Sequence, residues 1–148
     1  MNKSLKTGIA VVVALAVTAL FFIYSNPLAF FGESGSIGQS GQLVVQDETI
    51  GTGEEARPGD ILTVNYTGRL QDGTVFDTSS GEEPPRFMIG AGLMIQGWEQ
   101  GLPGMRQGGK RLLIIPPEMA YGEQGRGPIP PNATLIFEVE LVKVERPQ

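Results

Sequence analysis

The chain contains no cysteine and no histidine among its 148 residues. The absence of cysteine excludes disulfides, a thiol nucleophile and a lipid-modified N-terminal cysteine. Because histidine is missing as well, a zinc site lacks its usual ligands, and a hydrolase triad lacks the base for its nucleophile. We therefore predict a protein that holds no metal and no cofactor, and whose chemistry needs no activated nucleophile.

Positive charge is also scarce in the larger, C-terminal part of the chain. From Gln42 onward, 9 Lys and Arg residues stand against 15 Asp and Glu residues. A nucleic-acid-binding surface requires clustered basic residues, and the one adjacent basic pair, Lys110-Arg111, opens an apolar segment. We interpret this pair as a solvated strand end and exclude nucleic acid as a partner.

The N-terminal part, residues 1–31, is apolar after a short basic start. Lys3 and Lys6 precede an uncharged run over residues 8–24, and Leu28–Phe31 extends the apolar stretch. As a helix, the uncharged run reaches about 25 Å, slightly less than a bilayer's hydrocarbon core of about 30 Å. Lysines that precede a membrane span stay in the cytoplasm. The pattern predicts a signal-anchor, a hydrophobic transmembrane helix with the rest of the chain on the extracytoplasmic (periplasmic) side.

A cleaved signal peptide is the alternative for this segment. Signal peptides carry an apolar region of about 7–15 residues, followed by a small-x-small cleavage site. The run here is longer and no convincing Ala-x-Ala follows it, which favours the anchor; a secreted or periplasmic protein after cleavage stays open. In both cases residues 32–41 form a Gly/Ser-rich linker, and residues 42–148 form one domain outside the cytoplasm.

Short strands and turns dominate this domain. Period-2 alternation of β-branched and aromatic residues is typical of strands, and Asp72-Gly73 is a strong hairpin signal. The helix candidate runs from Ile95 to about Leu102, with Trp98 on the same apolar face. The predicted strands are Leu43–Ile50, Ile61–Thr67, Thr74–Asp77, Arg86–Ile89, Arg111–Ile115 and Thr134–Val144.

The last predicted strand contains a break in its alternation. Apolar residues occupy one face as far as Leu141. After Leu141 the apolar residues, Val142 and Val144, are at the positions that would face the opposite side. An extra residue in the strand explains this shift, so we predict a β-bulge after Leu141. Five or six strands with one short helix place the domain in the α+β class.

Five short segments place an aromatic residue beside a turn or a polar group. They are Val64–Gly68, Val75–Ser79, Ile95–Glu99, Ala120–Gly122 and Ile129–Phe137. In this order and spacing the chain resembles the FKBP-type peptidyl-prolyl cis-trans isomerases, or rotamases, the immunophilins that bind macrolides. The resemblance covers Gln42 to Glu145. It implies a twisted antiparallel sheet wrapped around one short helix, a role in protein folding, and proline-containing polypeptides and macrolides as ligands.

The resemblance also implies a set of site residues. Those of the catalytic set are Tyr66, Asp77, Ile95 and Tyr121, with the Tyr121 hydroxyl and the Ile95 N–H as donors and Asp77 bonded to Tyr66. Those of the substrate-binding set are Phe76, Met94, Trp98, Ile129, Pro130 and Phe137, with Trp98 as the floor of the pocket. Core packing is the alternative for these aromatic residues, and a turn cap is the alternative for Asp77.

Two positions depart from the family pattern. Pro85 stands where relatives commonly carry an aromatic residue, so we expect one aromatic wall to be missing. Glu82 lies near the position of an arginine that partners the aspartate, which leaves macrolide affinity open. We predict an isomerase that acts on exported or membrane-associated proteins. The alternative is a non-catalytic or weakly catalytic module that binds a proline segment within a membrane protein complex.

Overall fold

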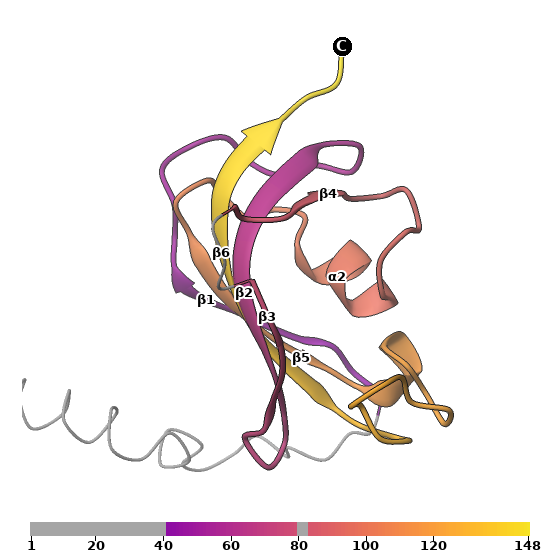
Figure 1. The fold of residues 1–148 in the computed structure, drawn as a ribbon. Helices are drawn as coiled ribbons and strands as arrows, with labels where there is room; N and C mark the ends of the chain where they lie inside the picture. Colours follow the sequence, from indigo (N-terminus) through magenta and orange to yellow (C-terminus); the bar gives the residue numbers. More distant parts are fainter. Residues whose placement is uncertain (1–40, 80–82) are drawn as a thin grey trace, which may run out of the picture. The chain divides into compact units, whose positions relative to one another are not determined.

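The computed structural model describes residues 41–79 and 83–148 (Figure 1). This part of the chain forms an antiparallel six-stranded sheet and one short α-helix, which confirms the sheet and helix predicted for the domain. The elements follow in the order β1 (Val44–Thr49), β2 (Ile61–Leu70), β3 (Val75–Thr78), β4 (Arg86–Met88), α2 (Gln96–Gly101), β5 (Lys110–Ile115), the 3₁₀ turn η1 (Pro117–Met119) and β6 (Leu135–Glu145).

The predicted anchor and most of the predicted linker, residues 1–40, lie outside the described residues, as does Glu82. Among the helices of residues 41–79 and 83–148, none has the length and apolar character that a membrane span requires.

The sheet brings together strands that are far apart in the sequence. Its order is β1-β5-β6-β2-β3, and β4 pairs with β2 beside this path. The last strand, β6, pairs with β5 on one side and β2 on the other. Alternate residues of a strand face the same side, and the core face of β6 carries the predicted residues Leu135, Phe137, Val139 and Leu141, all buried. The long β2–β6 pair therefore supplies a large part of the buried face of the sheet.

The predicted bulge lies in β6. Val64 of β2 pairs with Leu141, while the preceding Thr63 pairs with Lys143, so Val142 is the extra residue. Val142 is 41% exposed, whereas Val144 packs against the core. The break in alternation that the sequence shows is thus a β-bulge that keeps both ends of the strand in contact with the core.

Helix α2 packs against β5 through two glycines. A Cβ atom added at Gly97 would lie 2.4 Å from Cγ2 of Ile115, and one added at Gly101 would lie 2.8 Å from Cδ2 of Leu113. Only a residue without a side chain permits this approach. The close contact holds Trp98 of the same helix in the core, where it is 5% exposed.

Arg111 fastens the C-terminal end of α2 to the sheet. Its Nη1 donates to the carbonyl oxygens of Gly101 (2.8 Å) and Pro103 (3.1 Å). Its Nε and Nη2 bind both carboxylate oxygens of Asp47 on β1, at 2.6 and 3.0 Å. Arg111 is 7% exposed, so our interpretation of it as part of a solvated strand end is wrong. The guanidinium is therefore bound by backbone carbonyls and by a carboxylate that the fold brings to it, and these take the place of water.

Candidate active site

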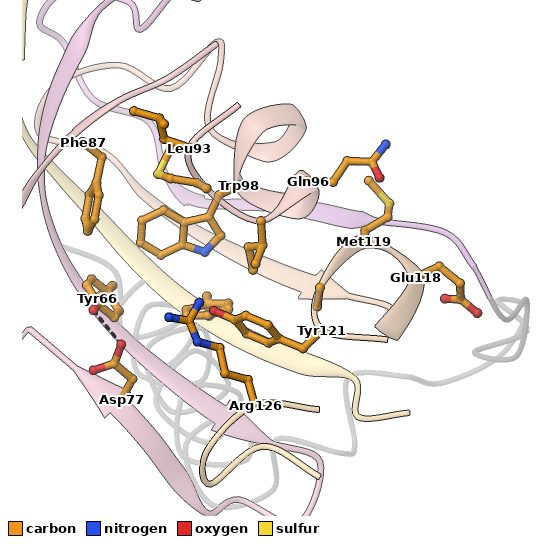
Figure 2. A pocket seen from close by; sticks show the side chains of 14 residues that line it. Tyr66, Asp77, Phe87, Leu93, Gln96, Trp98, Glu118, Met119, Tyr121 and Arg126 are labelled. Atoms are coloured by element: carbon orange, nitrogen blue, oxygen red, sulfur yellow. Dashed lines mark hydrogen bonds between the residues drawn. The ribbon is translucent and has the colours of Figure 1, made fainter. Parts of the chain in front are cut away.

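A cavity of about 570 Å³ opens between α2, the sheet and the segment that follows β5 (Figure 2). Strands β2, β3, β4 and β6 contribute to its wall, together with the loop before α2 and the turn η1. The lining residues are Tyr66, Asp77, Phe87, Leu93, Met94, Ile95, Gln96, Trp98, Glu118, Met119, Ala120, Tyr121, Arg126 and Phe137. Seven of the ten predicted site residues are among them.

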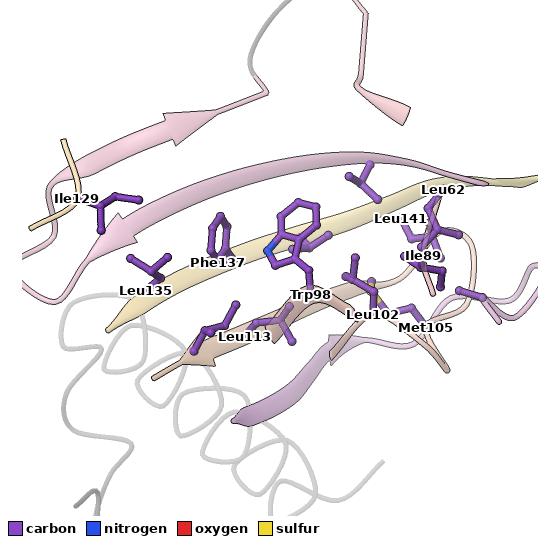
Figure 3. Packing of buried hydrophobic residues seen from close by; sticks show 14 residues of the cluster. Leu62, Ile89, Trp98, Leu102, Met105, Leu113, Ile129, Leu135, Phe137 and Leu141 are labelled. Atoms are coloured by element: carbon purple, nitrogen blue, oxygen red, sulfur yellow. The ribbon is translucent and has the colours of Figure 1, made fainter. Parts of the chain in front are cut away.

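Trp98 is the centre of an aromatic cluster. Three rings meet it edge to face, with centroids at 5.1 Å for Tyr66, 5.3 Å for Phe87 and 5.2 Å for Phe137. Each such contact contributes about 0.5–1.5 kcal/mol beyond the area that it buries. Figure 3 shows Trp98 and Phe137 adjacent in the core. In the described part of the chain the buried Nε1 of Trp98 has no hydrogen-bond partner. The cluster fixes a rigid apolar surface against the cavity.

Phe87 is a pocket residue that the sequence analysis did not assign. It lies on β4 opposite Leu62 of β2, and its ring packs on Trp98 and on Tyr66, at 6.4 Å from the latter. Pro85 is not among the lining residues. The sequence offered only a weak signal, an aromatic residue between Arg86 and Met88 in a short predicted strand. In the structure Phe87 is half-buried and both of these neighbours are exposed. An aromatic wall is therefore supplied from this strand.

Tyr66 and Asp77 form the polar edge of the pocket. The Tyr66 hydroxyl donates to Oδ2 of Asp77 at 2.8 Å. Burial, and secondly this hydrogen bond, raise the pKa of Tyr66 to about 12. The stabilising contribution of the protonated phenol is complete below the unfolded tyrosine pKa of about 10 and is lost only as the pH rises through about 12. The predicted hydrogen bond is present, and neutral pH leaves its donor protonated.

Two hydrogen-bond donors at the pocket have no partner in the described part of the chain. Ile95 is the N-cap residue of α2, with φ −58° and ψ 147°. Its carbonyl accepts from the N–H groups of Trp98 and Glu99, but its own N–H makes no hydrogen bond. The Tyr121 hydroxyl is likewise unbonded, and both residues line the cavity. These are the two donors that the sequence analysis proposed.

Three predicted binding residues lie outside the cavity lining. Phe76 packs behind the pocket, with its ring 5.5 Å from that of Phe137 and directly over Gly68, where an added Cβ would lie 2.6 Å from Cζ of Phe76. Ile129 is 7% exposed in the core and Pro130 is exposed. Direct contact of these residues with a ligand stays a prediction, and Phe76 supports the position of Phe137.

Glu99 holds the loop that forms one rim of the pocket. Its carboxylate accepts hydrogen bonds from the backbone N–H groups of Gly90 and Met94, the second at 3.4 Å. The loop between these residues carries Leu93, which is 81% exposed. The sequence analysis missed this role because a glutamate on an amphipathic helix is usually a solvated residue.

Substituting glutamine for Glu99 should lower kcat/KM about 2- to 10-fold. The amide retains one acceptor but turns an NH₂ group toward a backbone N–H, so one charge-assisted hydrogen bond is lost. We expect KM to rise more than kcat falls, because the loop forms part of the pocket wall and supplies neither of the two proposed hydrogen-bond donors. Glu48→Gln, on exposed β1, is the matched control. An unchanged KM in a folded Glu99→Gln protein would show that the loop keeps its position without Glu99.

Comparison with known proteins identifies the family of the chain. The model of the family described as FKBP-type peptidyl-prolyl cis-trans isomerase matches residues 52–142. The "FK506-binding protein" of Neisseria meningitidis serogroup B is 52% identical over 106 residues, covering 70% of this chain and 97% of the relative. The human "Peptidyl-prolyl cis-trans isomerase FKBP2" is 54% identical over 94 residues, covering 62% of this chain and 66% of the relative.

Solved structures share the fold. The crystal structure of AtFKBP13 matches with a TM-score of 0.65 at 41% identity, covering 68% of this chain and 91% of the other. The peptidyl-prolyl cis-trans isomerase of Pseudomonas syringae pv. tomato matches with a TM-score of 0.65 at 33% identity, covering 80% of this chain and 87% of the other.

Proposed function

Since this chain belongs to the FKBP-type peptidyl-prolyl cis-trans isomerases, its reaction is rotation about the peptide bond before proline, and we propose that it performs this reaction on exported or membrane-associated proteins. The observation that carries the site assignment is the pairing of a rigid aromatic floor with two unbonded donors, Ile95 N–H and Tyr121 Oη–H, at one cavity. The proposal has three parts: the chemistry of the pocket, its ligands, and its location.

The chemistry follows from the electronic structure of the amide. Rotation has to cross a barrier of about 18–20 kcal/mol because the planar bond has partial double-bond character. The twisted amide has lost that character and has a less polar carbonyl and a pyramidal nitrogen. A site that binds the twisted form better than either planar form lowers the barrier. The apolar wall formed by Trp98, Phe87 and Phe137 favours the twisted form, since water solvates the polar planar amide better.

Polar groups at the pocket would then orient the substrate. In our proposal the proline ring rests on Trp98, while Tyr121 donates to the carbonyl oxygen of the bond that rotates and Ile95 N–H donates to the next carbonyl along the chain. Asp77, held by Tyr66 at 2.8 Å, faces the same space and offers an acceptor. None of these roles requires a covalent intermediate or a cofactor.

Macrolides are the second class of ligand that we propose for the pocket. Relatives that share 52% identity with this chain are named FK506-binding proteins. The cavity volume of about 570 Å³ lies within the ordinary range for small-molecule sites, about 300–1,000 Å³. Quenching or enhancement of the fluorescence of Trp98, the single tryptophan of the chain, would report occupancy directly.

The proposed location is supported by the N-terminal sequence. Lys3 and Lys6 before an uncharged run fit a segment that crosses the membrane with the domain outside the cytoplasm. Fusing a reporter enzyme that is active only outside the cytoplasm to the C-terminus tests this topology, and an inactive reporter would overturn it. Intact mass measurement of the membrane-extracted protein then separates an uncleaved anchor from a cleaved signal peptide.

Replacing Tyr121 with phenylalanine should lower kcat/KM about 2- to 12-fold, because one neutral hydrogen bond contributes about 0.5–1.5 kcal/mol. The effect is modest, since the twisted amide's oxygen is no stronger an acceptor than that of the planar amide. The protein's melting temperature should not change, because the hydroxyl has no partner in the described structure. Exchange of an X-Pro peptide, followed by NMR, is the measurement.

The same variant separates catalysis from simple binding. If the domain is instead a binding module of a membrane complex, Tyr121→Phe should retain a partner isolated from detergent-solubilised membranes, and wild-type protein should give no peptide exchange. Acceleration by the wild type that falls in Tyr121→Phe supports the isomerase.

A further inference from the structure

Arg126 places an unneutralised positive charge at the mouth of the pocket. Its guanidinium carbon lies 5.6 Å from the centroid of the Tyr121 ring, and Arg126 is among the residues that line the cavity (Figure 2). Within the described residues it forms no ion pair. The arginines that do pair with a carboxylate there are Arg69, Arg86, Arg106, Arg111 and Arg146. The charge of Arg126 is therefore available to a ligand.

The backbone of Arg126 is held in place by a two-residue turn. Arg126 N–H donates to the carbonyl of Ile129, and Ile129 N–H donates back to the carbonyl of Arg126, both at 2.9 Å. Gly127, the first residue of the turn, has φ +54°, which suits glycine. Ile129 is buried at 7% exposure and anchors the turn in the core. The side chain of Arg126 thus starts from a fixed point beside Tyr121.

We infer that Arg126 determines specificity for clients that carry a carboxylate side chain on the residue before the proline. The inference rests on the proposed function. The carbonyl of the rotating bond belongs to the residue before proline. If Tyr121 donates to that carbonyl, the side chain of the same residue lies close to the Tyr121 ring and to the guanidinium above it. A glutamate at this position meets Arg126.

Two carboxylates also line the pocket and oppose this preference. Asp77 lies on β3, where it is engaged by the Tyr66 hydroxyl, and Glu118 lies on η1. Neither forms an ion pair with Arg126. The guanidinium of Arg126 lies over the ring of Tyr121 itself, and this contact places its charge beside the proposed position of the client side chain. The preference is local and is independent of the acidic net charge of the chain.

The expected size of the preference is small but measurable. An exposed ion pair changes an equilibrium or a rate by about 1.5- to 5-fold at low salt. Added salt should remove it, because exposed charges are screened over about 10 Å at 0.1 M and about 3 Å at 1 M ionic strength. A hydrophobic preference would not respond to salt in this direction.

The test compares matched tetrapeptides, Ala-Xaa-Pro-Phe, in which Xaa is glutamate, glutamine or lysine. The full-length protein in mild detergent is assayed for cis–trans exchange by NMR, as wild type, Arg126→Gln and Arg126→Lys. Arg57→Gln is the control, because Arg57 is exposed, makes no ion pair in the described part and does not line the cavity. Trp98 fluorescence confirms that each variant is folded.

We expect the wild type to favour glutamate over glutamine about 1.5- to 5-fold in kcat/KM, with lysine the poorest. The glutamate-to-glutamine ratio should approach 1 at high salt and in Arg126→Gln, stay above 1 in Arg126→Lys, and be unchanged in Arg57→Gln. A ratio that Arg126→Gln leaves unaltered, or a wild type that prefers glutamine, overturns the inference alone. Absence of exchange with every peptide overturns the proposed function, and the inference with it.

Discussion

Replacing Trp98 with alanine should lower kcat/KM for X-Pro exchange about 30- to 150-fold in the protein that remains folded. The proline ring loses its floor, and about 100 Å² of apolar burial corresponds to about 2–3 kcal/mol. The three aromatic rings that now meet the indole edge to face also lose their common partner. Removing this large, buried side chain should reduce the free energy of unfolding by about 3–5 kcal/mol. Peptide exchange and denaturant unfolding of the same sample give both values.

Leu102→Ala is the control that separates the two effects. Leu102 lies at the end of the same helix, is fully buried, and does not line the cavity. Its truncation should cost about 2–5 kcal/mol of stability while the folded fraction keeps its activity. If Trp98→Ala is folded and retains the wild-type kcat/KM, the proline ring does not rest on this residue.

Substituting alanine for Arg111 should destabilise the domain by about 3 kcal/mol and lower its melting temperature by about 12–24 °C. The guanidinium satisfies two backbone carbonyls at the end of α2 and a carboxylate on β1. Without it, the buried carbonyl of Gly101 loses its partner. We take the lower end of the range for broken buried pairs because the Asp47 side chain is 41% exposed and regains water. Thermal unfolding followed by circular dichroism measures the effect.

Arg69→Ala is the matched surface variant. Arg69 pairs with Glu138 at 3.9 Å, with both side chains exposed, so its loss should change stability by less than about 1 kcal/mol. Equal effects of the two substitutions would show that Arg111 acts as an ordinary surface charge and does not fasten α2 to the sheet.

The local patterns of the sequence were sufficient to predict the strands and the helix, while the antiparallel sheet was implied by the resemblance. Alternation in β6 identified its buried face, and the shift after Leu141 identified the bulge at Val142. The environment of Arg111 could not be read in the same way. Its partner Asp47 lies 64 residues away along the chain, and the helix carbonyls reach it only once α2 has packed on β5. Such contacts arise from the fold rather than from local periodicity.

The site residues also divide into those that the sequence identified and those whose position depends on the fold. Trp98, Tyr66, Asp77, Ile95 and Tyr121 meet at one cavity, as the ordered segments suggested. Phe76 does not line the cavity and packs instead against Phe137 and over Gly68. The register of the β2–β3 pair shifts between Gly68 and Arg69, an irregularity that alternation in the sequence alone does not locate. Phe87 was overlooked since a three-residue strand offers too short a period to identify its inward face.

The role of Glu99 depends on the conformation of a loop. Gly90 has φ +81°, and its N–H reaches the glutamate only because the chain turns back from β4 toward α2. A glycine at that position is visible in the sequence, but the hydrogen-bond acceptor that its turn meets is not.

The most direct test of the account is cis–trans exchange of an Ala-Leu-Pro-Phe peptide, measured by NMR over a series of concentrations of the full-length protein, with and without FK506. We predict an exchange rate that rises linearly with protein concentration and returns to the uncatalysed rate when FK506 saturates the pocket, with a parallel change in Trp98 fluorescence. A folded protein that binds FK506 but leaves the exchange rate at its uncatalysed value would contradict the claim that this aromatic pocket is a catalytic site.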